Sequence, residues 1–156
     1  MNPLYLEVSV VVLGIILFMV EAFSGAGSKR SIVYIGFIGL LGILAATFFA
    51  DPALLDSSAA YARFYSADPL AIFLKQFTLL TTAVVLVMAL EYAPTVEAGL
   101  PAERRGAGLG EFYTLPIFAC AGLMWMASAV DFVMIFVSLE LVTITFYILV
   151  SYLRRN

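Results

Sequence analysis

The sequence contains no histidine and a single cysteine, Cys120. One thiol cannot build a disulfide, an iron–sulfur cluster or a thiolate zinc site within the chain. The missing histidines remove the commonest metal ligand and the commonest proton shuttle, so we expect no bound metal or haem. A phosphate loop, a nucleophile elbow, a metal-binding helix motif and a basic aromatic patch for nucleic acid are absent too. The chain therefore has no recognisable hydrolytic or redox site of its own, and we expect no nucleic-acid partner.

Charge is also scarce, at 12% of 156 residues, while 63% are hydrophobic. A soluble domain has about 45–50% apolar and about 25% charged residues. The composition therefore predicts an integral membrane protein, with lipid around it. The net charge of −3 is less informative than where the charges lie.

Long apolar runs account for most of the chain. A helix needs about 20 apolar residues to span the hydrocarbon, and five segments qualify. The sequence predicts an all-α membrane protein, a single transmembrane region over residues 1–156, with helices at about Leu4–Phe23, Ile32–Phe49, Pro69–Tyr92, Phe112–Ser128 and Phe132–Leu153. The segment between the third and fourth helices, Ala93–Gly110, is expected to be a flexible loop. The fourth and fifth helices should form a tight hairpin.

Basic residues predict the orientation of these helices. Cytoplasmic loops are enriched in lysine and arginine. Six cations fall on one side of an alternating five-helix chain: Lys29, Arg30, Arg104, Arg105, Arg154 and Arg155. The other side has Arg63 as its only cation and carries Asp51, Asp56, Asp68 and Asp131. We therefore expect the N-terminus outside and the C-terminus in the cytoplasm.

Glu140 is the first candidate for chemistry, because it lies near the middle of the fifth predicted span. An ionised and unpaired carboxylate there costs several kcal/mol, so such acids are protonated, paired or hydrated, and they are functional sites by default. Ser138 and Thr143 flank it within a turn and could hold a water beside it. The alternative is a structural carboxyl group that bonds a neighbouring helix.

Lys75 is the second candidate, about two turns inside the third helix. It shares its depth with Glu140 to within a few ångströms, so the two could pair if their helices touch. A buried lysine can exchange protons because burial lowers its pKa. Its long stem equally allows it to reach the outer interface.

The remaining polar positions favour structural interpretations. Glu7, Glu21, Glu91 and Glu111 fall near helix ends and are expected to be solvated or at headgroup level. Asp131 could cap the fifth helix. Three glycines spaced every three residues in the second helix predict close packing between helices: Gly36, Gly39 and Gly42.

Several motifs resemble one family. They are Leu109–Leu115 with its Gly-Glu-Phe-Tyr helix entry, Met124–Asp131, the Leu-Glu-Leu of Ser138–Leu141, Tyr147–Asn156, and the Asp-Pro-Leu-Ala-Ile-Phe-Leu-Lys that ends at Lys75. Together the chain resembles subunit N of the bacterial proton-pumping NADH–quinone oxidoreductase, respiratory complex I. Leu139 before the glutamate favours N over the sister subunits L and M, which tend to have an aromatic residue there. Ser138 stands where the family usually has glycine.

The resemblance implies a role for Glu140 at the start of a line of buried charges and waters that carries protons across the membrane. In the family its partner is a lysine on the seventh of about fourteen helices. This chain would supply the three leading helices and the start of the first inverted repeat. Either a second polypeptide supplies the later helices, or the chain is a truncated product. Other membrane-arm subunits would be further partners, in the cell inner membrane. FMN, iron–sulfur clusters and quinone are expected in other subunits of the complex.

Two rival interpretations remain. In the first, the chain is a non-catalytic membrane scaffold or assembly subunit, and Glu140 serves helix–helix recognition only. In the second, it is a fragment of a cation/proton antiporter subunit.

Overall fold

A computed structural model describes residues 2–23, 30–51, 55, 60–99 and 109–153. Backbone polar groups in hydrocarbon must bond within their own segment, so apolar runs of this length form helices. The five α-helices are α1 (Leu4–Phe23), α2 (Arg30–Thr47), α3 (Pro69–Gly99), α4 (Leu109–Ser128) and α5 (Phe132–Leu153), with a short 3-10 helix η2 (Ala60–Arg63) before α3. The predicted all-α class with five helices is confirmed.

Four of these helices are long and apolar enough to cross a membrane: α1, α3, α4 and α5. The apolar stretch of α2, Ser31–Thr47, is shorter. Five of the six cations behind the expected orientation lie outside the described residues, namely Lys29, Arg104, Arg105, Arg154 and Arg155. The orientation therefore stays a prediction.

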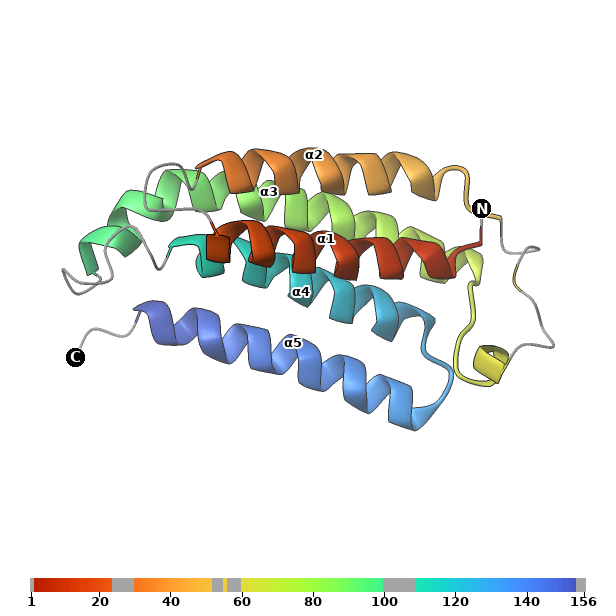
Figure 1. The fold of residues 1–156 in the computed structure, drawn as a ribbon. Helices are drawn as coiled ribbons and strands as arrows, with labels where there is room; N and C mark the ends of the chain where they lie inside the picture. Colours follow the sequence, from red (N-terminus) through yellow and green to blue (C-terminus); the bar gives the residue numbers. More distant parts are fainter. Residues whose placement is uncertain (1, 24–29, 52–54, 56–59, 100–108, 154–156) are drawn as a thin grey trace.

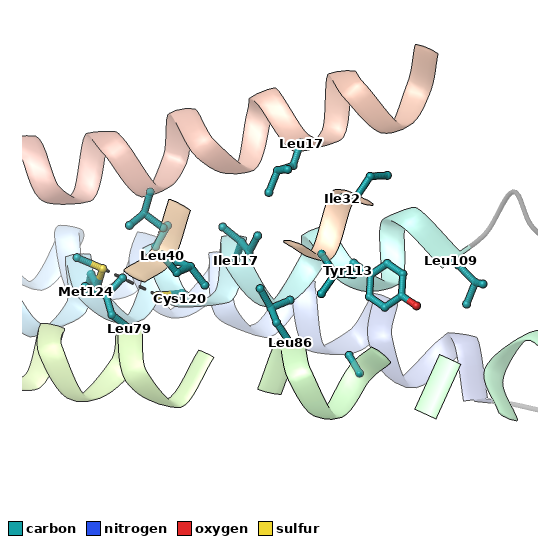
Figure 2. Packing of buried hydrophobic residues seen from close by; sticks show 14 of the residues in the cluster. Leu17, Ile32, Leu40, Leu79, Leu86, Leu109, Tyr113, Ile117, Cys120 and Met124 are labelled. Carbon is teal, nitrogen blue, oxygen red and sulfur yellow. Dashed lines mark hydrogen bonds between the residues drawn. The ribbon is translucent and has the colours of Figure 1, made fainter. Parts of the chain in front are cut away.

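The helices lie side by side, with α4 at the centre and α5 against its outer side (Figure 1). The centre of the bundle is a cluster of buried apolar side chains from α1 to α4 (Figure 2), including Leu17, Leu40, Leu86, Ile117 and Met124. Within the described chain, α5 contributes no residue to this cluster. Only 11% of the apolar span of α5 is buried, against 56% for α4.

The third helix differs from its expected end at Tyr92, because α3 runs on through Pro94 to Gly99. A proline inside a helix removes one backbone hydrogen bond. Burial of Ala93 and Val96 in the apolar cluster offsets that loss. The first part of the expected Ala93–Gly110 loop is thus helical, residues 100–108 lie outside the described chain, and α4 begins at Leu109.

Close packing at the α2 glycines is confirmed at two of the three positions. A Cβ atom at Gly39 would lie 2.7 Å from the Leu13 side chain, and one at Gly36 would lie 3.2 Å from Leu17. No atom lies within 4 Å at Gly42. These two glycines let α1 approach α2 closely.

Candidate functional site

A buried ion pair joins α1 to α3. The Lys75 Nζ atom lies 2.7 Å from Glu7 Oε1, and both side chains are buried. Glu7 lies in the first turn of α1, and Lys75 lies about two turns into α3. Because α1 and α3 both begin at the end of the bundle that holds the N-terminus (Figure 1), these two depths bring the opposite charges together.

Tyr65 completes the cluster. Its hydroxyl group accepts a hydrogen bond from Lys75 Nζ at 2.9 Å and donates to Glu7 Oε1 at 2.8 Å. The Lys75 ammonium also lies 4.9 Å from the centre of the Tyr65 ring, within the range of a cation–π interaction. We call Glu7, Tyr65 and Lys75 the buried charge cluster. Each charged group in it has a hydrogen-bonded partner, which is what buried charges require.

Burial raises the pKa of the Tyr65 hydroxyl above its ordinary value of 10.0, and the neighbouring Glu7 carboxylate adds to the effect. Both causes disfavour the phenolate, because a second negative charge would face the carboxylate in a poorly hydrated place. Tyr65 therefore stays protonated and keeps the O–H group that it donates to Glu7.

The backbone of Tyr65 is held by the turn between α4 and α5. Tyr65 and Ala129 form an antiparallel bridge. Beside it, Ser66 N donates to the Ser128 carbonyl at 2.8 Å, and Val130 N donates to the Phe64 carbonyl at 3.0 Å. The segment before α3 and the α4–α5 turn are therefore joined at the same end of the bundle as the buried charge cluster.

Asp131 begins α5 as an N-cap. Its side-chain oxygen accepts a hydrogen bond from Val133 N at 3.0 Å. This confirms the predicted capping role, which satisfies one of the free amides of the first helical turn.

Glu140 lies on the exposed side of α5. Its neighbours one turn away, Phe136 and Ile144, are 54% and 51% exposed. Among the residues that the structure describes, Glu140 makes no hydrogen bond or ion pair. The carboxylate therefore projects from an apolar helix face that the rest of the described bundle leaves open.

The hydroxyl groups near Glu140 donate hydrogen bonds to backbone carbonyls of their own helix. Ser138 Oγ donates to the Met134 carbonyl at 2.7 Å, and Thr143 Oγ1 donates to the Leu139 carbonyl at 2.8 Å. Ser138 is buried against α4, where its carbonyl oxygen would lie 3.1 Å from a Cβ atom at Gly122. Both hydroxyls thus bond to backbone carbonyls one turn earlier in α5.

Two sequence-based interpretations change with this geometry. A pair between Lys75 and Glu140 was possible if α3 and α5 touched, but the Lys75 ammonium pairs with Glu7, while Glu140 lies on an open face. Glu7 was expected to be solvated at a helix end, and this was wrong because it is fully buried against Lys75. Its position near a helix end concealed that the segment before α3 covers it.

Sequence reasoning missed Glu7 and Tyr65 as members of a polar site. A signal was present for Glu7: it and Lys75 lie about 4 and 9 Å along helices that begin on the same side, at 1.5 Å per residue. No group of side chains suited to hold a metal ion occurs in the part of the chain that the structure describes.

Four helices long and apolar enough to cross a membrane, with a buried ion pair between two of them and a carboxylate within another, are typical of an integral membrane protein. No protein-family model matches the chain. Several curated proteins do match it. The chain is 37% identical over 126 residues to NADH-quinone oxidoreductase subunit N of Heliobacterium modesticaldum, and this match covers 81% of this chain and 24% of that protein. It is 32% identical over 152 residues to NAD(P)H-quinone oxidoreductase subunit 2 of a Synechococcus species, covering 96% of this chain and 26% of the relative.

A third match runs over the whole chain. It is 30% identical over 156 residues to NADH-quinone oxidoreductase subunit N of Trichlorobacter lovleyi, and it covers 30% of that protein. The chain is homologous to NADH-quinone oxidoreductase subunit N/2. It spans about a quarter of the length of the curated relatives that it matches.

Proposed function

We propose that this chain is part of a proton-translocating membrane-arm subunit of an NADH–quinone oxidoreductase, and that Glu140 takes up and releases protons within it. The exposed position of Glu140 in the middle of α5 carries the proposal. A carboxylate facing lipid is unfavourable. In the working subunit a polar partner should therefore cover this face, and the family resemblance implies a lysine from a later helix.

The remaining helices would come from the rest of the subunit, because the chain matches about a quarter of its relatives. They would complete the first inverted repeat around α4 and α5. The partners proposed here are that polypeptide segment and the neighbouring membrane-arm subunits, in the cell inner membrane.

Electron transfer would occur elsewhere. The proposal assigns FMN, the iron–sulfur clusters and quinone to other subunits of the complex, and this chain would receive the energy of quinone reduction through its neighbours. The role of its own residues is to hold and move protons. Lys75 acts in this scheme through its pair with Glu7, as a fixed charge of the bundle.

Glu140→Gln in the intact complex tests the proposal, with Glu91→Gln as a control, because Glu91 is also an exposed glutamate but belongs to α3. The amide keeps the shape of the side chain and removes the titrating group. Proton pumping in membrane vesicles should fall by at least about 10²-fold, the range that a positioned proton-transfer group supplies. The control should pump normally, and both variants should assemble on native gels.

The other outcomes separate the rivals. Loss of assembly in Glu140→Gln would favour the scaffold role, in which the carboxylate serves helix–helix recognition. Pumping and assembly that both survive would overturn the proposal. A rate that follows sodium concentration would favour the cation/proton antiporter interpretation.

A further inference from the structure

We propose that Tyr65 is a positioning residue that anchors the α4–α5 hairpin, and with it Glu140, to the buried Glu7–Lys75 pair. The inference rests on the proposed function only in that Glu140 is taken as the proton site. Its structural part stands on the contacts of Tyr65 alone.

Tyr65 is attached at both of its ends. Its hydroxyl group sits between Lys75 and Glu7, at 2.9 and 2.8 Å. Its backbone pairs with Ala129 in the α4–α5 turn. One residue thus connects the ion pair of α1 and α3 to the point where the chain enters α5.

The anchor matters because α5 is held along its length almost entirely by α4. Its contacts with the described helices are made with α4 and, to a small extent, with α3. It adds nothing to the apolar cluster of the bundle. Its tilt and depth are therefore set by the α4 interface and by the turn at its start, which Ser66 and Phe64 hold through two backbone hydrogen bonds.

Because a helix is rigid, a displacement of its first turn also moves the residues further along it. Glu140 lies nine residues after Asp131, about 13 Å along α5 at 1.5 Å per residue. A shift of the turn would move the carboxylate by a similar amount. Tyr65 would act on Glu140 by this route, without touching it.

The buried pair makes the anchor rigid. Hydrogen bonds in which one partner is ionised are shorter and about twice as strong as neutral ones. Tyr65 makes such bonds to both a carboxylate and an ammonium group, and the residue is only 4% exposed. Removal of the hydroxyl group alone should free the segment while the aromatic ring continues to fill its place.

Hydrogen–deuterium exchange of the whole chain in lipid nanodiscs tests the anchor, with Tyr65→Phe as the variant. Tyr5→Phe is the matched control, because Tyr5 lies on the same bundle but is 58% exposed. The amides of Ser66 and Val130 should exchange at least about tenfold faster in Tyr65→Phe, as expected for loss of a hydrogen bond to a charged group. The amides of Ala121 and Met124 in the core of α4 should be unchanged.

A second measurement follows α5 itself. Cys120 is the only cysteine, so a Cys120→Ser background allows nitroxide labels at Val8→Cys and Val137→Cys, positions that are 44% and 48% exposed. The distance distribution between α1 and α5 should broaden or shift in Tyr65→Phe and stay sharp in Tyr5→Phe.

Three results would overturn the proposal. Unchanged exchange at Ser66 and Val130 would show that the hydroxyl does not hold the bridge. Equal acceleration in the α4 core would show that Tyr65 supports the whole fold instead of the turn. An unchanged distance distribution would show that α5 is positioned without it. Neither measurement uses proton pumping, so failure here is distinct from a Glu140→Gln variant that still pumps.

Discussion

Lys75 Nζ in α3 lies 2.7 Å from Glu7 Oε1 in α1, and both side chains are buried. Two charges have thus been removed from water and from lipid together. Their mutual attraction, and the hydrogen bonds of the Tyr65 hydroxyl to both, compensate for the lost hydration. The pair is sensitive to loss of either member, because the remaining charge would have no partner.

The Lys75→Met variant should therefore lower the free energy of unfolding by about 3–5 kcal/mol, the loss typical when one partner of a buried pair is removed. Glu7→Met should do the same. The double variant should be more stable than either single variant, because two apolar side chains of similar length can replace a buried ion pair at little loss. Unfolding in mixed micelles measures all three, and single-variant losses that simply add in the double variant would contradict the pairing.

High pH should weaken the fold through Tyr65. Its pKa is raised above 10.0 by burial and by the Glu7 carboxylate. Above pH 10 the unfolded chain releases the phenol proton while the folded chain keeps it, so the unfolded state is favoured and stability falls as pH rises. Below pH 10 both states are protonated and the effect is absent.

The measurement is the difference in unfolding free energy between the natural chain and Tyr65→Phe as a function of pH. This difference should be constant below pH 10 and shrink above it, because the variant lacks the titrating hydroxyl. The other tyrosines are present in both proteins, so their contributions cancel in this difference. A difference that stays constant up to pH 12 would mean that Tyr65 ionises equally in both states.

The sequence predicted the class and most helix limits because both depend on local composition. The limits of α1 and α5 agree with the expected Leu4–Phe23 and Phe132–Leu153. The end of α3 was missed because Pro94 normally ends a helix, and the burial of Val96 that prevents this is a tertiary effect.

The polar site was harder to predict for a related reason. Lys75 was recognised from its depth, but its partner depends on which helices touch, and apolar spans carry little information about that. Tyr65 lies in a segment between helices, so nothing local distinguishes it from the other tyrosines. Its place in the cluster follows from the bridge to Ala129, which joins residues 64 positions apart in sequence.

Packing between α4 and α5 depends on Gly122. A Cβ atom there would lie 2.8 Å from Val142 Cγ2 and 3.1 Å from the Ser138 carbonyl oxygen. Gly122→Ala should therefore push the two helices apart and lower stability by about 1–3 kcal/mol, as overpacking does. Gly42→Ala is the control, because no atom lies within 4 Å of its Cβ position.

The control should be neutral or should stabilise α2 by about 0.5–1 kcal/mol, since alanine is a better helix former than glycine. Both are measured by unfolding in mixed micelles. Equal effects of the two substitutions would show that α4 and α5 are not in close contact at Gly122.

A hydrophobic carbodiimide should distinguish the two intramembrane acids. This reagent dissolves in lipid and modifies protonated carboxyl groups. Glu140 is exposed on an apolar face of α5, so the reagent should reach it and modify it. Glu7 is buried and paired with Lys75, so the reagent should not reach it. Mass spectrometry of the isolated chain in lipid gives the modified position. Modification of Glu7 before Glu140 in the natural chain would contradict both the buried pair and the open face of α5.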